Sequence, residues 1–281
     1  MIFLPDADEM ICLMQKNLLL IIALIFSVQI TFSQNIKRPD TYNYNRGVEA
    51  VQNDDTEEAL EYLNKELNDN PNNGYAYAWI AMVRNDQEEY GRALTAVNLA
   101  IKNIPKKDKL YRALAYAVRS DSYIGLGEEE KALTDLTSAI KETPDNPVLY
   151  ENRADLYYYM EKYDLADNDY QQIISIDPGS VAGYMGLGRN ANAEYRYNDA
   201  IAQFDYVTRL APDYVSGYSF RAESYLGLKK YNEAIDDIIH ALNIEFDDKA
   251  FYLMSQVADS ALVPLVTKLR IQSVKEPNNG F

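Results

Sequence analysis

The sequence has few of the residues on which most enzyme active sites and metal centres are built. Its 281 residues include one cysteine, Cys12, and one histidine, His240. A lone cysteine cannot form an intramolecular disulfide, and a lone histidine lacks the partners that a zinc site or an acid–base catalyst requires. We therefore expect a protein that is not an enzyme and that carries no metal and no cofactor. His240 is expected to be a surface or packing residue.

Basic residues are also scarce. The chain has 27 Lys and Arg against 43 Asp and Glu, which gives a formal net charge of -16. Contacts to nucleic-acid phosphates need clustered Lys and Arg, so a nucleic-acid partner is not expected. The charge favours protein or peptide partners that are neutral to basic.

Long apolar runs are absent except for one near the start. Residues 18–28 are apolar, Lys16 precedes them and small residues surround Ser33. This arrangement is typical of a secretory signal peptide covering residues 1–33, with cleavage after Ser33. The run is too short for a comfortable membrane span, which needs about 20 residues. Because three acidic residues precede Met14, we expect translation to start there. The mature protein, periplasmic or secreted, would begin with a short linker at 34–39.

Three kinds of residue recur along the chain at a nearly fixed interval. Alanine returns after 34, 39, 34, 34 and 34 residues, at Ala59, Ala93, Ala132, Ala166, Ala200 and Ala234. Proline follows the first five alanines by 12 residues, at Pro71, Pro105, Pro144, Pro178 and Pro212. Tyrosine keeps the same step at Tyr77, Tyr116, Tyr150, Tyr184, Tyr218 and Tyr252. One insertion, at residues 108–112, interrupts a 34-residue repeat, and we expect it to lengthen a helix end or a loop.

This pattern resembles the tetratricopeptide repeat family over about residues 40 to 275. The resemblance implies an all-α fold, a right-handed superhelical solenoid of antiparallel helix pairs, with a concave groove lined by the first helix of each repeat. Six repeats would fill residues 40–248, as units 40–73, 74–107, 113–146, 147–180, 181–214 and 215–248. A seventh, divergent repeat would occupy residues 249–276.

A glycine-rich stretch, Gly183-x-x-Gly186-x-Gly188, faintly resembles a phosphate-binding loop. It falls inside a predicted helix and does not follow a strand, so we interpret it as close helix packing. In each repeat, a small residue at position 8 and alanine at position 20 let two antiparallel helices approach each other.

The resemblance directs positions 2, 5, 9, 12 and 13 of each repeat toward the groove. Aromatic and acidic residues occupy several of these positions or lie beside them, namely Tyr44, Tyr75, Asp121, Glu151, Asp155, Tyr158 and Tyr159. Such a patch would suit a peptide with apolar anchors and a basic residue. The alternative is a solvated amphipathic face.

Some members of the family hold the carboxylate ends of chaperones with a basic clamp in this groove. The corresponding positions here are not basic, since they carry Ala117, Asp121, Asn152, Ala182 and Gly186. That ligand class is therefore not expected.

The function that we expect is a non-catalytic protein–protein interaction scaffold of the cell envelope, which binds a peptide or partner protein in the concave groove. The alternative is a structural subunit of a larger envelope assembly that contacts partners through its ends or convex face. An apolar patch in the groove would favour the first, and an apolar end or convex face the second.

Two positions vary together among the repeats. Repeats three, four and six carry Arg at position 7 and Asp at position 23, whereas repeats two and five carry neither and repeat one pairs Arg46 with Tyr62. Because the two positions lie on the two helices of one hairpin, the sequence predicts ion pairs within the repeat. The predicted pairs are Arg119 with Asp135, Arg153 with Asp169, and Arg221 with Asp237.

The C-terminal end resembles the middle of an array. Residues 277–281 repeat the junction at residues 71–75, and the helix before them is apolar on two sides, one of which carries Val263, Ile271 and Val274. Terminal repeats normally have a polar outer face. We therefore expect residues 277–281 to begin a truncated further repeat, continued by a longer gene product or covered by a partner.

Overall fold

The computed structural model describes residues 36–257, and the regular structure of these residues is helical throughout. The predicted signal peptide, the cleavage at Ser33, most of the predicted seventh repeat from residue 258 onward and the predicted truncated repeat at 277–281 lie outside the described residues. The helices form six successive pairs: α2 (Tyr42–Gln52) with α3 (Thr56–Asp69), α4 (Gly74–Asp86) with α5 (Tyr90–Asn103), α6 (Lys109–Gly125) with α7 (Glu129–Glu142), α8 (Pro147–Tyr159) with α9 (Tyr163–Ile176), α10 (Val181–Ala193) with α11 (Tyr197–Leu210), and α12 (Val215–Gly227) with α13 (Tyr231–Ile244). A further helix begins at Asp248.

One backbone device separates the two helices of every pair. Position 15 of each repeat has a positive φ between 57° and 68°, in Asp54, Glu88, Gly127, Glu161, Tyr195 and Lys229. This left-handed residue ends the first helix and turns the chain back for the second. Glycine occupies the position in one of the six repeats.

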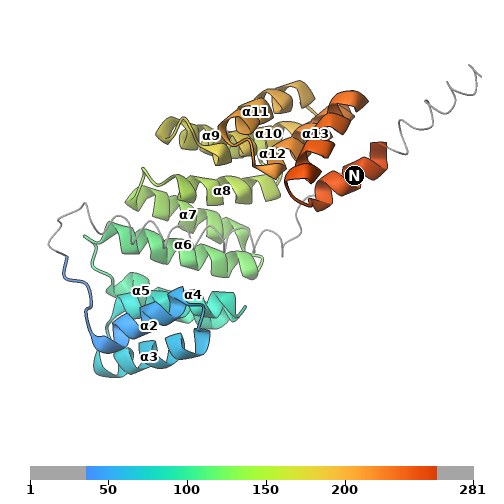
Figure 1. The fold of residues 1–281 in the computed structure, drawn as a ribbon. Coiled ribbons are helices and arrows are strands. Elements are labelled where there is room, and N and C mark those ends of the chain that lie inside the picture. Colours follow the sequence, from blue (N-terminus) through green and yellow to red (C-terminus); the bar gives the residue numbers. More distant parts are fainter. Residues whose placement is uncertain (1–35, 258–281) are drawn as a thin grey trace, which may run out of the picture. The chain divides into compact units, whose positions relative to one another are not determined.

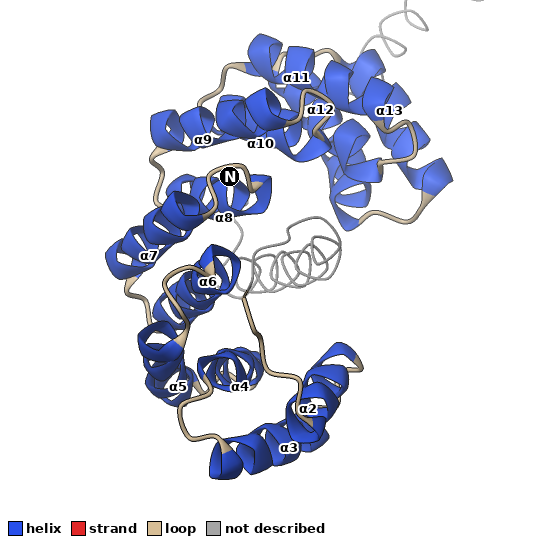
Figure 2. Cartoon of the chain, turned by 90° about the vertical axis from the view of Figure 1, so that its left-hand side faces the viewer, coloured by secondary structure: helices blue, strands red, loops and turns tan. Residues whose placement is uncertain are grey.

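The chain divides into two compact units, Met1–Leu165 and Ala166–Phe281. We call them unit 1 and unit 2, and Figure 1 labels the helices of both. In unit 1, the helices α2, α4, α6 and α8 lie along one side and α3, α5 and α7 along the other (Figure 2). We call the side formed by α2, α4, α6 and α8 the inner surface of unit 1. None of the described helices is both long and apolar enough to cross a membrane.

The five inserted residues lengthen a helix, as one of the two expectations had it. α6 has 17 residues and begins at Lys109, with Asp108 as its N-cap. The carboxylate of Asp108 accepts a hydrogen bond from the backbone amide of Tyr111 at 3.4 Å, which stabilises the first turn. The insertion therefore adds a turn on the inner surface of unit 1.

Small residues permit the close helix contacts that the repeat predicts. A Cβ atom at Gly186 would lie 2.2 Å from the Tyr170 ring, and one at Gly188 would lie 2.4 Å from the Phe204 ring. The glycine-rich stretch is therefore a packing feature, which confirms that interpretation. His240 is exposed and packs on Tyr218, with 4.2 Å between ring centroids. It is a surface histidine, as expected.

Candidate partner-binding surface

Three of the tyrosines predicted to face the groove are buried. The exposed fractions of Tyr44, Tyr75 and Tyr158 are 6%, 5% and 5%. The prediction that these three rings are open to a peptide in the groove is therefore wrong.

The inserted turn explains the burial of two of these rings. It places Tyr111 edge-on against Tyr75, with 4.8 Å between ring centroids, while the Tyr75 hydroxyl donates to Oδ2 of Asp108 at 3.0 Å. The Tyr44 hydroxyl donates to Tyr111 and accepts a hydrogen bond from Nε1 of Trp79 at 3.0 Å. Burial is the main reason that the pKa values of these three tyrosines are raised. The 34-residue repeat assigns no position to the inserted residues 108–112. The contacts of Asp108 and Tyr111 therefore could not be predicted from it.

The remaining predicted groove residues on α8 differ in accessibility. Tyr158 turns toward α9, its partner in the same hairpin, and packs edge-on against Tyr163, with 5.6 Å between ring centroids. Asp155 is 5% exposed, so the prediction that its carboxylate is open to a partner in the groove is also wrong. Tyr159 and Glu151 are half-buried and stay partly accessible.

The inner surface of unit 1 carries two carboxylates without a cationic partner among the described residues. The Oδ2 atom of Asp121 is buried and accepts no hydrogen bond. Burial, together with the charge of Asp86, raises the pKa of Asp121 well above its usual value. Asp86 is exposed at the surface, although desolvation of its carboxylate by the surrounding atoms and the charge of Asp54 raise its pKa to about 6. Asp121 was predicted as a groove residue, and Asp86 was missed although it occupies position 13, one of the groove positions.

Two of the three predicted ion pairs are present. Nη2 of Arg119 lies 2.7 Å from Oδ1 of Asp135, and Nη2 of Arg221 lies 2.7 Å from Oδ1 of Asp237. Arg153 and Asp169 fall in different units, so the third pair stays a prediction. In repeat one, Arg46 bonds Glu58 at 2.6 Å and lies over the Tyr62 ring at 5.6 Å.

In repeats three, four and six the arginine at position 7 also reaches back to the preceding repeat. Nη1 of Arg119 donates to Asn98 at 2.8 Å, Nη1 of Arg153 to Thr137 at 3.0 Å, and Nη1 of Arg221 to Asp205 at 2.7 Å. All three acceptors occupy position 25 of the repeat before. We call the two complete arrangements, centred on Arg119 and Arg221, the arginine clamps, because each joins two helices of its own repeat to the previous one.

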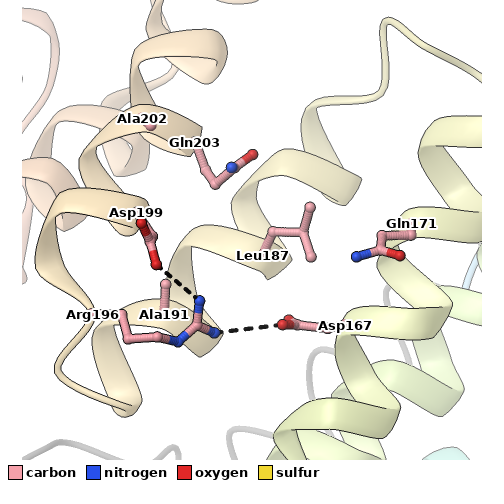
Figure 3. Close-up of a pocket in the computed structure, with 8 residues that line it drawn as sticks. All are labelled: Asp167, Gln171, Leu187, Ala191, Arg196, Asp199, Ala202 and Gln203. Atoms are coloured by element: carbon pink, nitrogen blue, oxygen red, sulfur yellow. Dashed lines mark hydrogen bonds and ion pairs between the residues drawn. The ribbon is translucent and has the colours of Figure 1, made fainter.

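Repeat five lacks this clamp, and a pocket of about 240 Å³ lies at the same place (Figure 3). Compared with repeats three, four and six, Leu187 and Gln203 replace the arginine and aspartate at positions 7 and 23, and Ala191 replaces the tyrosine at position 11. Across the pocket, Arg196 pairs with Asp167 at 3.5 Å and with Asp199 at 3.2 Å. The pocket is therefore volume that smaller side chains leave unfilled.

No group of three His, Cys, Asp or Glu side chains within residues 36–257 is arranged to hold a metal ion.

Comparison with known proteins agrees with the helix pairs. Models of the tetratricopeptide repeat match residues 44–108 and residues 148–180. The chain is a tetratricopeptide repeat protein. Its fold is all-α and of the tetratricopeptide solenoid class. Proteins of this family generally serve as scaffolds for protein interactions and are generally not catalysts.

The curated relatives are longer proteins. A TPR repeat-containing protein of Methanocaldococcus jannaschii is 25% identical over 218 residues, which are 73% of this chain and 36% of the relative. The small glutamine-rich tetratricopeptide repeat-containing protein 2 of Saccharomyces cerevisiae is 31% identical over 113 residues, 40% of this chain and 33% of the relative. The chain thus spans about a third of the length of either relative.

Solved structures share the fold at lower identity. A tetratricopeptide repeat protein from Parabacteroides merdae has a TM-score of 0.65 at 21% identity, covering 78% of this chain and 86% of the other. YrrB, a TPR protein with an unusual peptide-binding site, has a TM-score of 0.53 at 18% identity, covering 69% and 97%. These likenesses concern the fold alone.

Proposed function

We propose that this protein is a scaffold that binds an extended, basic segment of a partner protein along the inner surface of unit 1. The observation that carries the proposal is the carboxylate of Asp121, whose buried Oδ2 atom has no hydrogen-bond partner among the described residues, and which lies close enough to Asp86 for the charge of Asp86 to help raise its pKa. An ionised carboxylate that has lost water without gaining a partner is unfavourable, and a nearby cation reverses this. A Lys or Arg side chain of a partner would therefore bind here with a gain that a neutral side chain cannot supply.

Two further facts support a basic partner protein. The formal net charge of -16 steers cationic chains toward the molecule at low ionic strength. YrrB, whose fold is similar, has a peptide-binding site, so an array of this class can hold an extended peptide.

The experiment compares capture of partners by wild type and by a variant with Asp86→Asn and Asp121→Asn. Both proteins would be immobilised and exposed to envelope extract of the native host, and bound proteins would be identified by mass spectrometry. We expect one or more basic partners to be lost from the double variant. A matched control removes two exposed carboxylates elsewhere, Asp145→Asn with Asp213→Asn, and should retain them. Equal capture by all three proteins would refute the site.

A second candidate function is a structural subunit that contacts a larger assembly through unit 2. Large apolar side chains are exposed near the last described helices, with Phe246 at 67% and Phe251 at 61%. Their rings lie 5.9 Å apart between centroids, and Ile239, Ile244 and Tyr252 of the same stretch of chain are also exposed. A patch of this kind favours a protein contact. Replacing Phe246 and Phe251 by serine should then abolish co-purification of a partner that the aspartate variants retain.

We also propose that this role is performed after export. The basis is the signal-like segment ending at Ser33, and the expected mature protein begins at Gln34. N-terminal sequencing of soluble protein from the native host tests this, and recovery of an intact Met1 or Met14 end would contradict it.

A further inference from the structure

The linker before α2 inserts an arginine between two repeats. Residues 36–40 have no regular structure, and the side chain of Arg38 reaches Asp108, 70 residues further along the chain. Nε of Arg38 donates to Oδ2 of Asp108 at 3.0 Å, and Nη2 donates to Oδ1 at 3.2 Å. The guanidinium lies over the Tyr111 ring, 4.7 Å from its centroid. This is the fork geometry with which arginine, but not lysine, recognises a carboxylate.

The acceptor side of this contact is formed by helices of unit 1 and not by the linker. Asp108 is 1% exposed and is held by the Tyr75 hydroxyl from α4 and by the backbone amide of Tyr111 in α6. We call Asp108, Tyr75 and Tyr111 the arginine socket. If Arg38 leaves, the socket keeps a buried carboxylate without a cation, which is costly. The buried carboxylate of Asp108 therefore needs a cationic partner such as arginine. The helices that form the socket do not require this arginine to belong to the linker.

The linker, by contrast, contributes a single charged side chain to this contact. Among the described residues of the linker, Arg38 makes the hydrogen bonds to Asp108 and remains 26% exposed, while Ile36 and Pro39 are half-buried and Lys37 is exposed. An extended segment attached through one side chain can be displaced by another segment that offers the same group.

We propose that the socket is a binding site for an arginine side chain in an extended segment of a partner protein, and that the chain's own linker occupies it until the partner displaces Arg38. This inference rests on the proposed function in assigning the displacing arginine to a partner. It adds that the partner carries arginine at this point, not lysine, and that binding competes with an intramolecular contact.

The test uses a fluorescent peptide with the sequence of residues 35–40, Asn-Ile-Lys-Arg-Pro-Asp, and a second peptide in which citrulline, which is neutral, replaces the arginine. Binding to the full chain is measured by fluorescence anisotropy. We expect Arg38→Ala to bind the arginine peptide at least ten times more tightly than wild type does, because its socket is empty. The citrulline peptide should bind the Arg38→Ala variant at least ten times more weakly than the arginine peptide does.

Asp108→Asn in the Arg38→Ala background is the matched control. Asparagine also caps a helix, so α6 should be retained while the charge that holds the guanidinium is lost. We expect at least a tenfold loss of peptide binding, with an unchanged far-ultraviolet circular dichroism spectrum. Trp79 is the only tryptophan and bonds Tyr44, which bonds Tyr111, so its emission should shift when the peptide enters the empty socket.

Several results would overturn the inference. These are equal binding by wild type and Arg38→Ala, equal binding of the two peptides, and binding that survives Asp108→Asn. If Arg38→Ala does not fold, Arg38→Lys serves instead, since lysine keeps the charge but loses the fork, and peptide binding should still exceed that of wild type. Peptide binding is independent of Asp86 and Asp121, so a failure of the acidic site and a failure of the socket are distinguishable.

Discussion

The arginine clamps show how a single side chain can set the coupling between neighbouring repeats. Asp135 is 3% exposed and Asp237 6%, whereas their arginines remain partly accessible. A buried carboxylate of this kind is tolerated because the guanidinium offers two parallel hydrogen bonds and a third to the repeat before. The clamp therefore stabilises a hairpin and an interface at once.

Replacing Arg119 by methionine should strand the buried carboxylate of Asp135. We expect the free energy of unfolding to fall by about 3 kcal/mol, the usual cost of removing one member of a largely buried pair. Urea unfolding followed by circular dichroism measures this change. Arg46→Met in repeat one is the control, since that arginine bonds partly exposed carboxylates and its loss should change stability little. Similar losses in both variants would mean that burial of the pair does not matter.

The acidic pair predicts an unusual dependence of stability on pH. The folded-state pKa of Asp86 is about 6 and that of Asp121 is raised well above 3.8, so the folded state binds protons more tightly than the unfolded state. The contribution of these two aspartates to the free energy of unfolding is therefore most favourable below about pH 4, and it is lost as the pH rises through about 6 and above. Asp121→Asn should raise the thermal midpoint at neutral pH, where relieving a buried charge is worth about 1–3 kcal/mol, and should change it little near pH 4.

Calorimetry at both pH values checks this, with Asp145→Asn as the exposed control. A gain that is the same at both pH values would show that ionisation of Asp121 is not the cause.

At the scale of the element, the turn inside each hairpin is a point of strain. Glu88 and Lys229 adopt φ of 58° at an exposed position where a side chain is disfavoured. Glycine at this position removes the steric cost of the Cβ atom, which is about 1–2 kcal/mol per residue. Part of that gain is offset, because glycine loses more backbone entropy on folding than other residues do. We expect Glu88→Gly and Lys229→Gly each to stabilise the protein by about 0.5–1 kcal/mol. Lys229→Ala, which keeps Cβ, should give no such gain in the same unfolding experiment, and Gly127→Ala should lose stability.

The pocket of repeat five predicts that a missing clamp can be installed. Leu187→Arg with Gln203→Asp would recreate positions 7 and 23 of repeat six, with Gln171 at position 25 as the acceptor in the repeat before. Each single change leaves a charge without its partner, whereas the double change pairs them. We expect a favourable coupling of about 1–3 kcal/mol in a double-mutant cycle of unfolding free energies. Additive effects would mean that the backbone of repeat five does not allow the pair.

At the scale of the whole molecule, most of the interactions described join helices of one repeat or of adjacent repeats, and the contacts that the inserted turn of α6 makes with Tyr44 and Arg38 are the exception. α4 contacts α2, α3, α5 and α6, for example, and α6 contacts α4, α5 and α7. Stability in such an array is approximately a sum of repeat and nearest-neighbour contributions.

Because contacts are local, part of the array should fold alone. We expect residues 36–162, which end before α9, to remain helical and to unfold cooperatively, at a lower temperature than the full chain. Circular dichroism and amide hydrogen exchange of the fragment test this. If the amides of residues 36–162 are protected from exchange in the full chain but not in the fragment, unit 1 needs unit 2 in order to fold.

Much of the architecture follows from local sequence. The alanine and proline periods predict the helix pairs, since small residues are needed at each crossing and proline follows the second helix in the first five pairs. The pairs of Arg119 with Asp135 and Arg221 with Asp237 were also predictable, because two positions one hairpin apart vary together.

What the tertiary structure decided is which side chains are covered. Tyr44 and Tyr75 lie at groove positions of their repeats, yet the extra turn of α6 brings Tyr111 and Asp108 against them and excludes water. A repeat period describes the average unit and carries no information about a turn that one unit adds. Nor does it place Arg38 against Asp108, because that contact joins a linker to a helix cap 70 residues away and depends on how two repeats are stacked.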